Sequence, residues 1–321
     1  MLSLNDFSAK QILFLVTKEK EKLSFRNDNI LITDADGKIK HQSSCYRLFA
    51  IFIIGHISIT SVIIQKSRQF GFSIILLTDS FRPYQLISNT AEANVILRKK
   101  QYDYTGLGAA QQLIRNKIGN QQKALQSIRS HAYDTIHAIK LLKEYQQRIM
   151  ETKSIQELMG VEGTASRLFF REFYASFEWK GRKPRVKPDM INALQDIGYT
   201  ILFCYIDAML SLFGFDRYCG ILHRQFYMRK SLVCDLVEPF RVIIDKQIRK
   251  SINLNQFKKE DFEIYEKKWC LRYKESAAYS SVFIGAIMAE KESIYTYVRE
   301  FYRVFMKDKL ESEMPYWEVE K

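Results

Sequence analysis

The chain has 321 residues and a mass of 37.9 kDa, a size that suits two domains or one large domain. Hydrophobic residues make up 47% of it, with 22 Phe, 18 Tyr and 3 Trp, so intrinsic disorder is excluded for most of the length. Its net charge of +13 makes a polyanion the first partner to test, with acidic substrates and anionic membranes as alternatives. Only 5 Pro and 13 Gly favour long regular elements, mostly helices.

The first 92 residues predict a small β-rich domain with one helix. The expected strands cover residues 11–17, 23–33, 48–54 and 72–77, and the expected helix covers residues 60–70. Turn signals at residues 27–29 and 34–37 interrupt this region, and Gly71 closes the helix.

Helical periodicity replaces that pattern from residue 93 onward. Residues 199–215 are apolar nearly all round, which predicts a buried central helix, and a last amphipathic helix is expected over residues 290–308. The predicted fold class is therefore α+β, with a β-rich domain at 1–92 and a larger α-helical domain at 93–321.

Cysteine usage and hydropathy indicate a cytoplasmic protein that does not enter a membrane. The five cysteines form no C-x-x-C pair and leave one unpaired, and no signal peptide is apparent, so reduced thiols are expected. The most apolar uncharged run, residues 48–65, contains Gly55 and His56 and is better interpreted as strand, turn and helix than as a membrane span.

Glu162 is the first candidate for a chemical role. It lies on a predicted helix face whose other members, apart from Ser166, are apolar: Ile155, Leu158, Met159, Phe169 and Phe173. A carboxylate on a buried face needs a cation, a metal or a proton. The flanking Gly160 and Gly163 leave room for a ligand, but a buried ion pair, or a place at the rim of the face, is the commoner outcome.

His223, Asp235 and Glu238 complete the candidate set. Taken alone, His223 is more often a hydrogen-bonded structural histidine than a ligand. Asp235 and Glu238 share one helix face among apolar residues, and Pro239 should break or restart that helix. Alternatively, both acids are helix N-terminal charges that favour the dipole after Ser231.

Two carboxylates from these candidates, together with the imidazole, form a ligand set suited to Mg²⁺ or Mn²⁺. Phosphodiester chemistry commonly uses such a divalent cation. Crowding of Glu162 and Glu238, with Asp235 nearby, predicts a raised pKa for at least one carboxyl group when no cation is bound. On that reasoning, Glu162→Gln should be as stable as the wild type, or slightly more stable, in chelator.

Positive charge is concentrated in the middle third, where residues 96–189 hold 18 Lys and Arg against 9 Asp and Glu. A Gly- and Pro-containing loop in this region is interpreted as a phosphate-binding loop, with a solvated linker as the alternative. Two arginines on the Glu162 helix are further phosphate candidates, or ordinary surface charges. The predicted DNA-binding residues are Arg167, Arg171, Lys180, Arg182, Lys183, Arg185 and Lys187.

Several motifs, in this order, resemble the CRISPR-associated integrase family, the endonuclease of the adaptation module. The motifs are Arg98-x-x-Gln101-Tyr102, Lys117-Ile-Gly-Asn120-Gln121, Met159-Gly-Val-Glu162-Gly163, Lys187-Pro188-Asp189-x-x-Asn192, and Gly220-Ile-Leu-His223 followed by Asp235-Leu-Val-Glu238-Pro-Phe-Arg241. The match is strong over residues 95–250, whereas the β-rich domain contributes no sharp motif.

The resemblance implies roles for particular residues. Glu162, His223 and Glu238 carry over as catalytic metal ligands, Asp235 as a supporting acid, and Arg241 as a basic residue near the phosphate. One departure is Met228, where many relatives have Gly in the turn before the Asp235 helix.

The resemblance also implies a metal-dependent DNA integrase. In this reaction, the 3′-hydroxyl of a captured DNA fragment attacks a phosphodiester bond at a repeat boundary of a CRISPR array. The implied partners are double-stranded DNA, a second copy of the chain bound through the β-rich domain, and a small second adaptation protein with a ferredoxin-like fold. The alternatives are a branched-DNA or repair nuclease that uses water as nucleophile, and a non-enzymatic helical DNA-binding protein.

Overall fold

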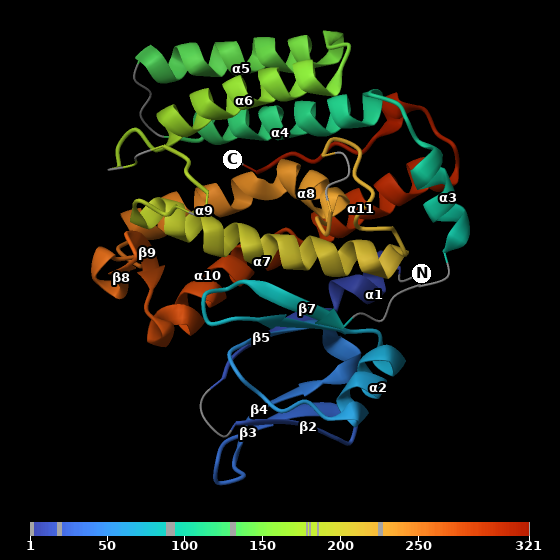
Figure 1. Cartoon of the computed structure of the whole chain (residues 1–321), viewed down its shortest axis with the longest axis vertical. Coiled ribbons are helices and arrows are strands. Elements are labelled where there is room, and N and C mark those ends of the chain that lie inside the picture. The colour runs from blue at the N-terminus through green and yellow to red at the C-terminus, as the bar shows by residue number, and fades with distance from the viewer. Residues whose placement is uncertain are drawn as a thin grey trace.

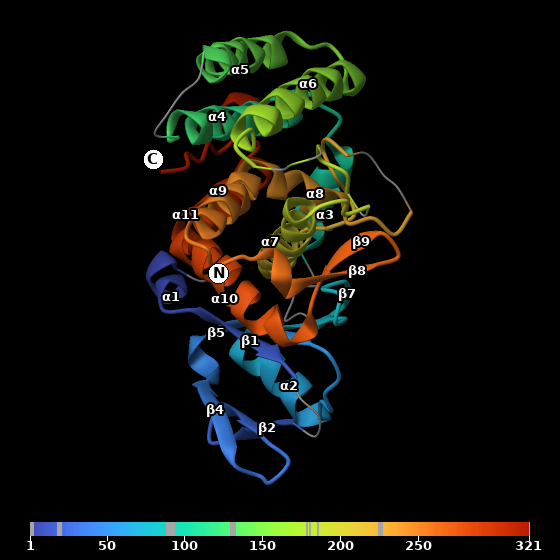
Figure 2. The same ribbon diagram turned by 90° about the vertical axis from the view of Figure 1, so that its left-hand side faces the viewer.

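The structure is a computed structural model, in which a β-rich region precedes a larger helical one (Figures 1 and 2). It describes residues 3–17, 21–87, 94–128, 133–177, 179, 181–184, 186–223 and 227–320. The predicted α+β fold class is confirmed. The boundary predicted between residues 92 and 93 lies outside the described residues and stays a prediction.

Two sheets form the β-rich region. The four-stranded sheet has the order β1-β5-β6-β7, with β1, β5 and β6 parallel and β7 antiparallel to β6. The three-stranded sheet has the order β2-β3-β4 and is antiparallel. The elements are α1 Leu4–Ser8, β1 Gln11–Val16, β2 Lys22–Arg26, β3 Asn29–Thr33, β4 Ile39–Ser44, η1 Cys45–Arg47, β5 Leu48–Ile54, α2 Ser61–Phe70, β6 Ser73–Leu77 and β7 Pro83–Ile87.

The strands that the sequence predicted are those with buried apolar residues. Every residue of β5 is buried, as expected for an interior strand of a sheet covered on both faces. The predicted turn between β2 and β3 has positive φ at Asn27 and Asp28, and Gly71 ends α2 at φ 76°. The sequence pattern missed β4 and β7 because both are largely exposed edge strands, held by main-chain hydrogen bonds rather than by an apolar face.

The helical region is built in layers, with α4, α5 and α6 farthest from the sheets and α7 in the middle (Figure 1). Its elements are α3 Val95–Asp103, α4 Gly108–Gln126, α5 Tyr133–Glu151, α6 Ile155–Phe173, α7 Met190–Phe213, α8 Ser231–Val237, η2 Glu238–Phe240, α9 Arg241–Asn253, η3 Lys259–Asp261, β8 Phe262–Tyr265, β9 Lys268–Leu271, η4 Tyr273–Glu275, α10 Ser276–Ala289, α11 Lys291–Met306 and η5 Glu311–Glu313. The β8–β9 hairpin was not predicted.

Helix α7 is the predicted central helix, and it begins earlier than expected. The Asp189 side chain caps it by accepting a hydrogen bond of 2.8 Å from the Asn192 N–H, and Gly214 ends it at φ 83°. Among the described helices, α7 alone is long and apolar enough to cross a membrane, but 78% of its most apolar 18-residue window is buried inside the fold. It is therefore a core helix of the described structure.

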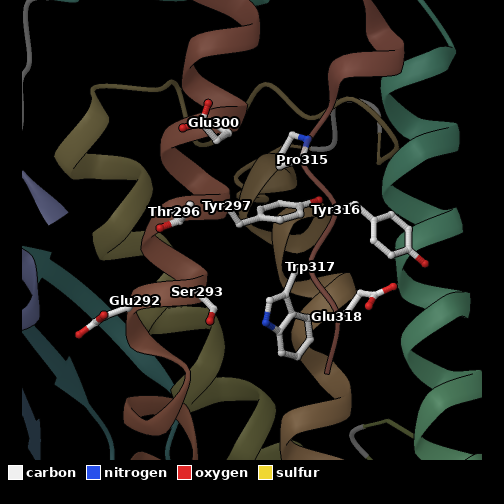
Figure 3. Close-up of a pocket in the computed structure, with 9 residues that line it drawn as sticks. All are labelled: Glu292, Ser293, Thr296, Tyr297, Glu300, Pro315, Tyr316, Trp317 and Glu318. Carbon is white, nitrogen blue, oxygen red and sulfur yellow. The ribbon is translucent and has the colours of Figure 1, made fainter. Parts of the chain in front are cut away.

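The C-terminal segment packs back against α4. Asn116 and Asn120 hold its main chain through the carbonyl of Trp317 and the N–H groups of Trp317 and Val319. A pocket of about 690 Å³ lies between this segment and α11, and Figure 3 shows Tyr297 and Trp317 among its lining side chains. None of the residues predicted for catalysis lines this pocket.

Candidate functional site

A cleft of about 1130 Å³ lies among the helices, next to the β6–β7 turn. Its walls include residues of α4, α6, α7 and α9, together with the loop before α7. The charged side chains along it are Arg82, Lys117, Arg182, Lys187, Arg229, Arg241 and Lys268, against Glu162, Asp196, Glu238 and Asp245. Cations outnumber acids along this cleft, so it suits a polyanion.

Two predicted metal-ligand carboxylates meet in this cleft and share one ammonium group. Lys117 Nζ of α4 lies 2.7 Å from Glu238 Oε2 and also pairs with Glu162 Oε1. The Lys117 and Glu238 side chains are buried, whereas Glu162 keeps 22% of its side chain exposed. Ser166 donates a hydrogen bond of 2.8 Å to Glu162, one turn along α6. Glu162 is therefore a paired carboxylate, the commoner of the outcomes considered for it.

The predicted rise in carboxyl pKa is wrong. Burial alone would raise the pKa of Glu238, but the charges of Arg241 and Lys117 lower it to about 2. At Glu162, burial has the largest effect and raises the pKa, as does repulsion from Glu238, but the charge of Lys117 together with the hydrogen bonds from Lys117 and Ser166 leaves the pKa lowered. The sequence reasoning counted the acids without the two cations that fold against them.

Arg241 is held on its other side by an aromatic ring. Its Nη2 donates to Glu238 Oε1 over 2.9 Å, and its guanidinium lies 4.9 Å from the centroid of the Tyr199 ring. The Tyr199 hydroxyl donates to the Asp245 carboxylate over 2.8 Å, and Gln195 adds a hydrogen bond of 3.1 Å. Tyr199 and Asp245 were not predicted as site residues.

Asp235 holds the segment that carries His223. Its fully buried carboxylate accepts hydrogen bonds from the N–H groups of Ile221, Leu222 and His223 over 2.7 to 3.0 Å. His223 Nδ1 lies 2.6 Å from Asp235 Oδ1, so Nε2 is the ring nitrogen left for another partner. A side chain at Gly220 would bring Cβ to 2.8 Å from Asp235 Oδ2, which explains the glycine there.

The donor set fits a hard divalent cation in chemistry, although it is not a preformed cage. Among the described residues, no group of three or more His, Cys, Asp or Glu side chains stands at metal-binding spacing. However, Glu238 Oε2 is buried and lies 2.7 Å from Lys117 Nζ, the position of a positive charge that a cation could replace. With Glu162 and His223 Nε2 it offers the oxygen and nitrogen donors that Mg²⁺ or Mn²⁺ accepts, where Lys117 now balances the charge.

The buried face of the Glu162 helix includes Leu158, Phe169 and Phe173 as predicted, but it is shifted at one edge. Met159 is 45% exposed, and Val161 and Ala165 are buried instead, so Glu162 stands at the rim of the buried face. The predicted space around the two glycines is real, because a Cβ added at Gly160 or Gly163 would meet no atom within 4 Å.

Only part of the predicted DNA-binding set faces the cleft. Arg182 and Lys187 line it, and Arg182 pairs with Asp196 over 2.7 Å. Arg171, on the exposed side of α6, instead pairs with Glu172. Exposed outside this cleft are Arg167, Arg171 and Lys183. Lys180 and Arg185 lie outside the described residues.

Sequence reasoning gave no site role to α4, although its motif was noted. Besides Lys117, Asn120 donates to the carbonyl of Pro239 over 3.2 Å, and Gln121 donates to Ser166 over 3.4 Å. As predicted, the α-helix is interrupted at Pro239, which lies in the short 3₁₀ helix η2 between α8 and α9. The sequence feature that could have indicated a site role for α4 is the Lys117–Gln121 motif, whose polar side chains are buried in the structure.

A β-rich region, a helical core and an acidic centre within a basic cleft define a protein of the nucleic-acid-processing class. The family model described as CRISPR associated protein Cas1 matches residues 14–283, so the chain belongs to the Cas1 family. The resemblance stated from the motifs is thereby confirmed.

Curated relatives support the same assignment. The CRISPR-associated endonuclease Cas1 1 of Thermodesulfovibrio yellowstonii is 30% identical over 258 residues, covering 76% of this chain and 81% of the relative. The protein of the same name from Chlorobaculum tepidum is 28% identical over 271 residues, covering 78% of each. The chain is therefore a member of a family of CRISPR-associated endonucleases.

Solved structures share the fold. A CAS1 protein from Thermotoga maritima superimposes with a TM-score of 0.79 at 16% identity, covering 92% of this chain and 97% of that one. A casposase bound to integration product gives 0.78 at 21% identity, with 97% and 95% covered. A chain of a Cas6-RT-Cas1--Cas2 complex gives 0.81 at 22% identity, covering 98% of this chain and 36% of the other.

Proposed function

We propose that the protein is a metal-dependent DNA integrase that inserts captured DNA into a CRISPR array. The observation that carries the proposal is that Glu162 and Glu238 share the Lys117 ammonium group in a basic cleft, while Asp235, one helical turn before Glu238, holds the His223 ring. Acidic groups at the centre of a cationic cleft suit catalysis on a polyanion, whereas a site that only bound DNA would gain nothing from them.

In this proposal, Glu162, Glu238 and His223 Nε2 hold Mg²⁺ or Mn²⁺. When bound, the cation polarises the scissile phosphate and lowers the pKa of the attacking hydroxyl group. Asp235 keeps the imidazole in one orientation and one tautomer, the role that carboxylates usually play behind a ligating histidine. Arg241, held between Glu238 and the Tyr199 ring, directs its guanidinium toward the phosphate.

Lys117 has two tasks in this proposal. Without a cation its ammonium group balances the charges of Glu162 and Glu238. With a cation present that balance no longer depends on it, and Lys117 becomes a donor to a phosphate oxygen in the same cleft. The residue then contributes to the charge stabilisation of the transition state.

The reaction exchanges one phosphodiester bond for another. The 3′-hydroxyl oxygen of the incoming DNA forms a bond to the target phosphorus, the bond from that phosphorus to the target 3′-oxygen breaks, and that oxygen takes up a proton. No covalent enzyme intermediate and no external energy source are needed, so positioning and charge stabilisation are sufficient.

The proposed partners are double-stranded DNA, a second copy of the chain and a small second adaptation protein. Support comes from the structural neighbours, one bound to an integration product and one part of a Cas1--Cas2 complex. The β-rich domain at residues 1–92 is proposed as the dimerising part. The five free cysteines suit a cytoplasmic site of action.

Site variants test this function. Glu162→Gln, His223→Ala and Glu238→Gln should each abolish joining of a 3′-hydroxyl DNA end to a supercoiled plasmid in Mn²⁺, while the protein remains a folded dimer. Glu157→Gln, an exposed glutamate on the same helix, is the matched control and should join DNA normally. Normal joining by any of the three site variants would overturn the ligand assignment.

A further inference from the structure

The motif Arg98-x-x-Gln101-Tyr102 on α3 has no part in the chemistry above, yet its polar atoms converge on one loop. Gln101 is 3% exposed. Its Nε2 donates to the carbonyls of Asp216 over 2.7 Å and Cys219 over 3.0 Å, and its Oε1 accepts a hydrogen bond of 3.0 Å from the Asp216 N–H. These three hydrogen bonds of the amide thus all go to two residues of the same loop.

The neighbours of Gln101 on α3 bind the same loop. Arg98 Nε donates to the Gly214 carbonyl over 3.3 Å, and the Tyr102 hydroxyl donates to Asp216 Oδ2 over 2.6 Å. The Cys219 thiol contacts the carbonyl of Gln101 at 3.7 Å. One face of α3 therefore clamps residues 214–219.

The clamped loop leads directly to the histidine of the site. It begins where α7 ends at Gly214 and runs through Cys219 into Gly220, three residues before His223. Downstream, Asp235 holds the N–H groups of residues 221–223. The segment thus has two anchors, Gln101 ahead of the histidine and Asp235 at the histidine itself.

The two anchors have different effects on the imidazole. Asp235 binds Nδ1 and the N–H groups of residues 221–223, so it fixes the histidine itself, whereas Gln101 fixes the backbone that leads from α7 into Gly220. Gln101 pairs with both a carbonyl and an N–H of Asp216, so a shift of the loop along α3 would break at least two hydrogen bonds in a buried setting.

We propose that Gln101 is a positioning residue for His223, acting through the main chain of residues 216–219. This inference rests on the proposed function, because His223 is a working residue only there. Without the Gln101 hydrogen bonds, the loop and His223 could move away from their positions. Loss of a contact that orients a ligating residue typically lowers activity about 10- to 100-fold. The substrate, bound elsewhere in the cleft, would be affected little.

The test compares Gln101→Met with Gln111→Met. Gln111 is a matched control, because its buried amide likewise holds a chain segment, through the carbonyls of Met150 in the last turn of α5 and of Thr152 just after it. Methionine has nearly the same length and none of the hydrogen bonds. Three quantities are measured for each protein: thermal stability, amide exchange of residues 214–223, and KM and kcat for DNA joining.

The positioning role predicts a pattern that a merely structural role would not produce. In Gln101→Met, amide exchange should rise at residues 216–223 and not in β5, and kcat should fall about 10- to 100-fold with KM within about twofold. Gln111→Met should lose similar stability and keep its kcat. The proposal is overturned if Gln101→Met keeps wild-type protection at residues 221–223, or if both variants lose kcat alike. If wild type joins no DNA, the proposed function fails, and the exchange comparison alone then decides whether the clamp exists.

Discussion

Removal of the Lys117 ammonium group should lower the unfolding free energy by an amount that can be derived from the structure. Lys117→Met keeps the length and burial of the side chain and leaves Glu162 and Glu238 facing each other without their shared cation. Glu238 retains the charged Arg241 at 2.9 Å, whereas Glu162 retains the neutral Ser166 hydroxyl group at 2.8 Å. The variant should therefore be destabilised, with most of the loss at Glu162.

The magnitude follows from the Glu238 carboxyl group. Holding its pKa at about 2, rather than the usual 4.5, corresponds to roughly 3 kcal/mol in favour of the charged form. Arg241 and Lys117 share that stabilisation, and Lys117 adds its pairing with Glu162. We expect Lys117→Met to lose about 2–3 kcal/mol of unfolding free energy at pH 7. This is near the lower end of the range that is typical when one partner of a buried ion pair is removed.

The pH dependence has a definite sign. Both carboxyl groups have lowered pKa values, so the stabilisation is present above about pH 4.5 and is lost as the pH falls toward 2. In Lys117→Met the carboxyl groups take up protons more readily, so its deficit should be full at pH 7 and shrink below about pH 4.5. The measurement is urea unfolding in chelator at pH 7 and pH 4.

Lys123→Met is the matched control, because Lys123 stands on the same helix in an exposed pair with Glu318 and should cost less than about 1 kcal/mol. Added Mn²⁺ should raise the stability of Lys117→Met more than that of the wild type, since no ammonium group competes for the carboxylates. If the two lysine variants lose the same stability at pH 7, or if the Lys117→Met deficit does not shrink in acid, the shared ion pair is not what the structure indicates. The same pairing reverses the expectation for Glu162→Gln, which should now lose stability in chelator.

Three further outcomes are expected. Met228 has φ 58°, a region that favours glycine, so Met228→Gly should raise the unfolding free energy by about 1 kcal/mol without loss of DNA joining. Changing both Arg182 and Lys187 to Ser should lower the slope of log K against log salt by up to about 1.8, roughly 0.9 for each lost phosphate contact, while Lys183→Ser, outside the cleft, should leave it unchanged. Gly163→Ala should stabilise α6 by about 0.5–1 kcal/mol, since the added methyl group meets no protein atom, and slower joining would indicate that DNA approaches there closely.

Elements with a strong burial pattern could be predicted from the sequence, and weakly patterned ones could not. The fully apolar β5 and the nearly all-apolar α7 were recognised, because such runs have few solutions other than the core. The edge strands β4 and β7 were missed, since their partners are main-chain groups of neighbouring strands and their side chains are mostly exposed. Local periodicity carries no information about such pairing.

The site shows the same division between local and tertiary information. The resemblance of the motifs to the Cas1 family brought Glu162, His223 and Glu238 together as one set, and in the structure Glu162 and Glu238 pair with the same lysine. That lysine comes from α4, 45 residues before Glu162, and its contact depends on how α4 packs against α6 and η2. The direction of the carboxyl pKa values could not be predicted without that packing.

The proposed reaction is tested most directly by following a labelled DNA duplex with a free 3′-hydroxyl in the presence of a supercoiled plasmid, Mn²⁺ and the second adaptation protein. Denaturing gels separate strands joined to the plasmid from strands that were only cut. Transesterification predicts joined strands that disappear when the donor ends in a 3′-deoxy sugar, when chelator is added, or when Glu238→Gln replaces the wild type. Plasmid that is nicked equally with either donor, with no joined strand, would contradict it and indicate a nuclease that uses water.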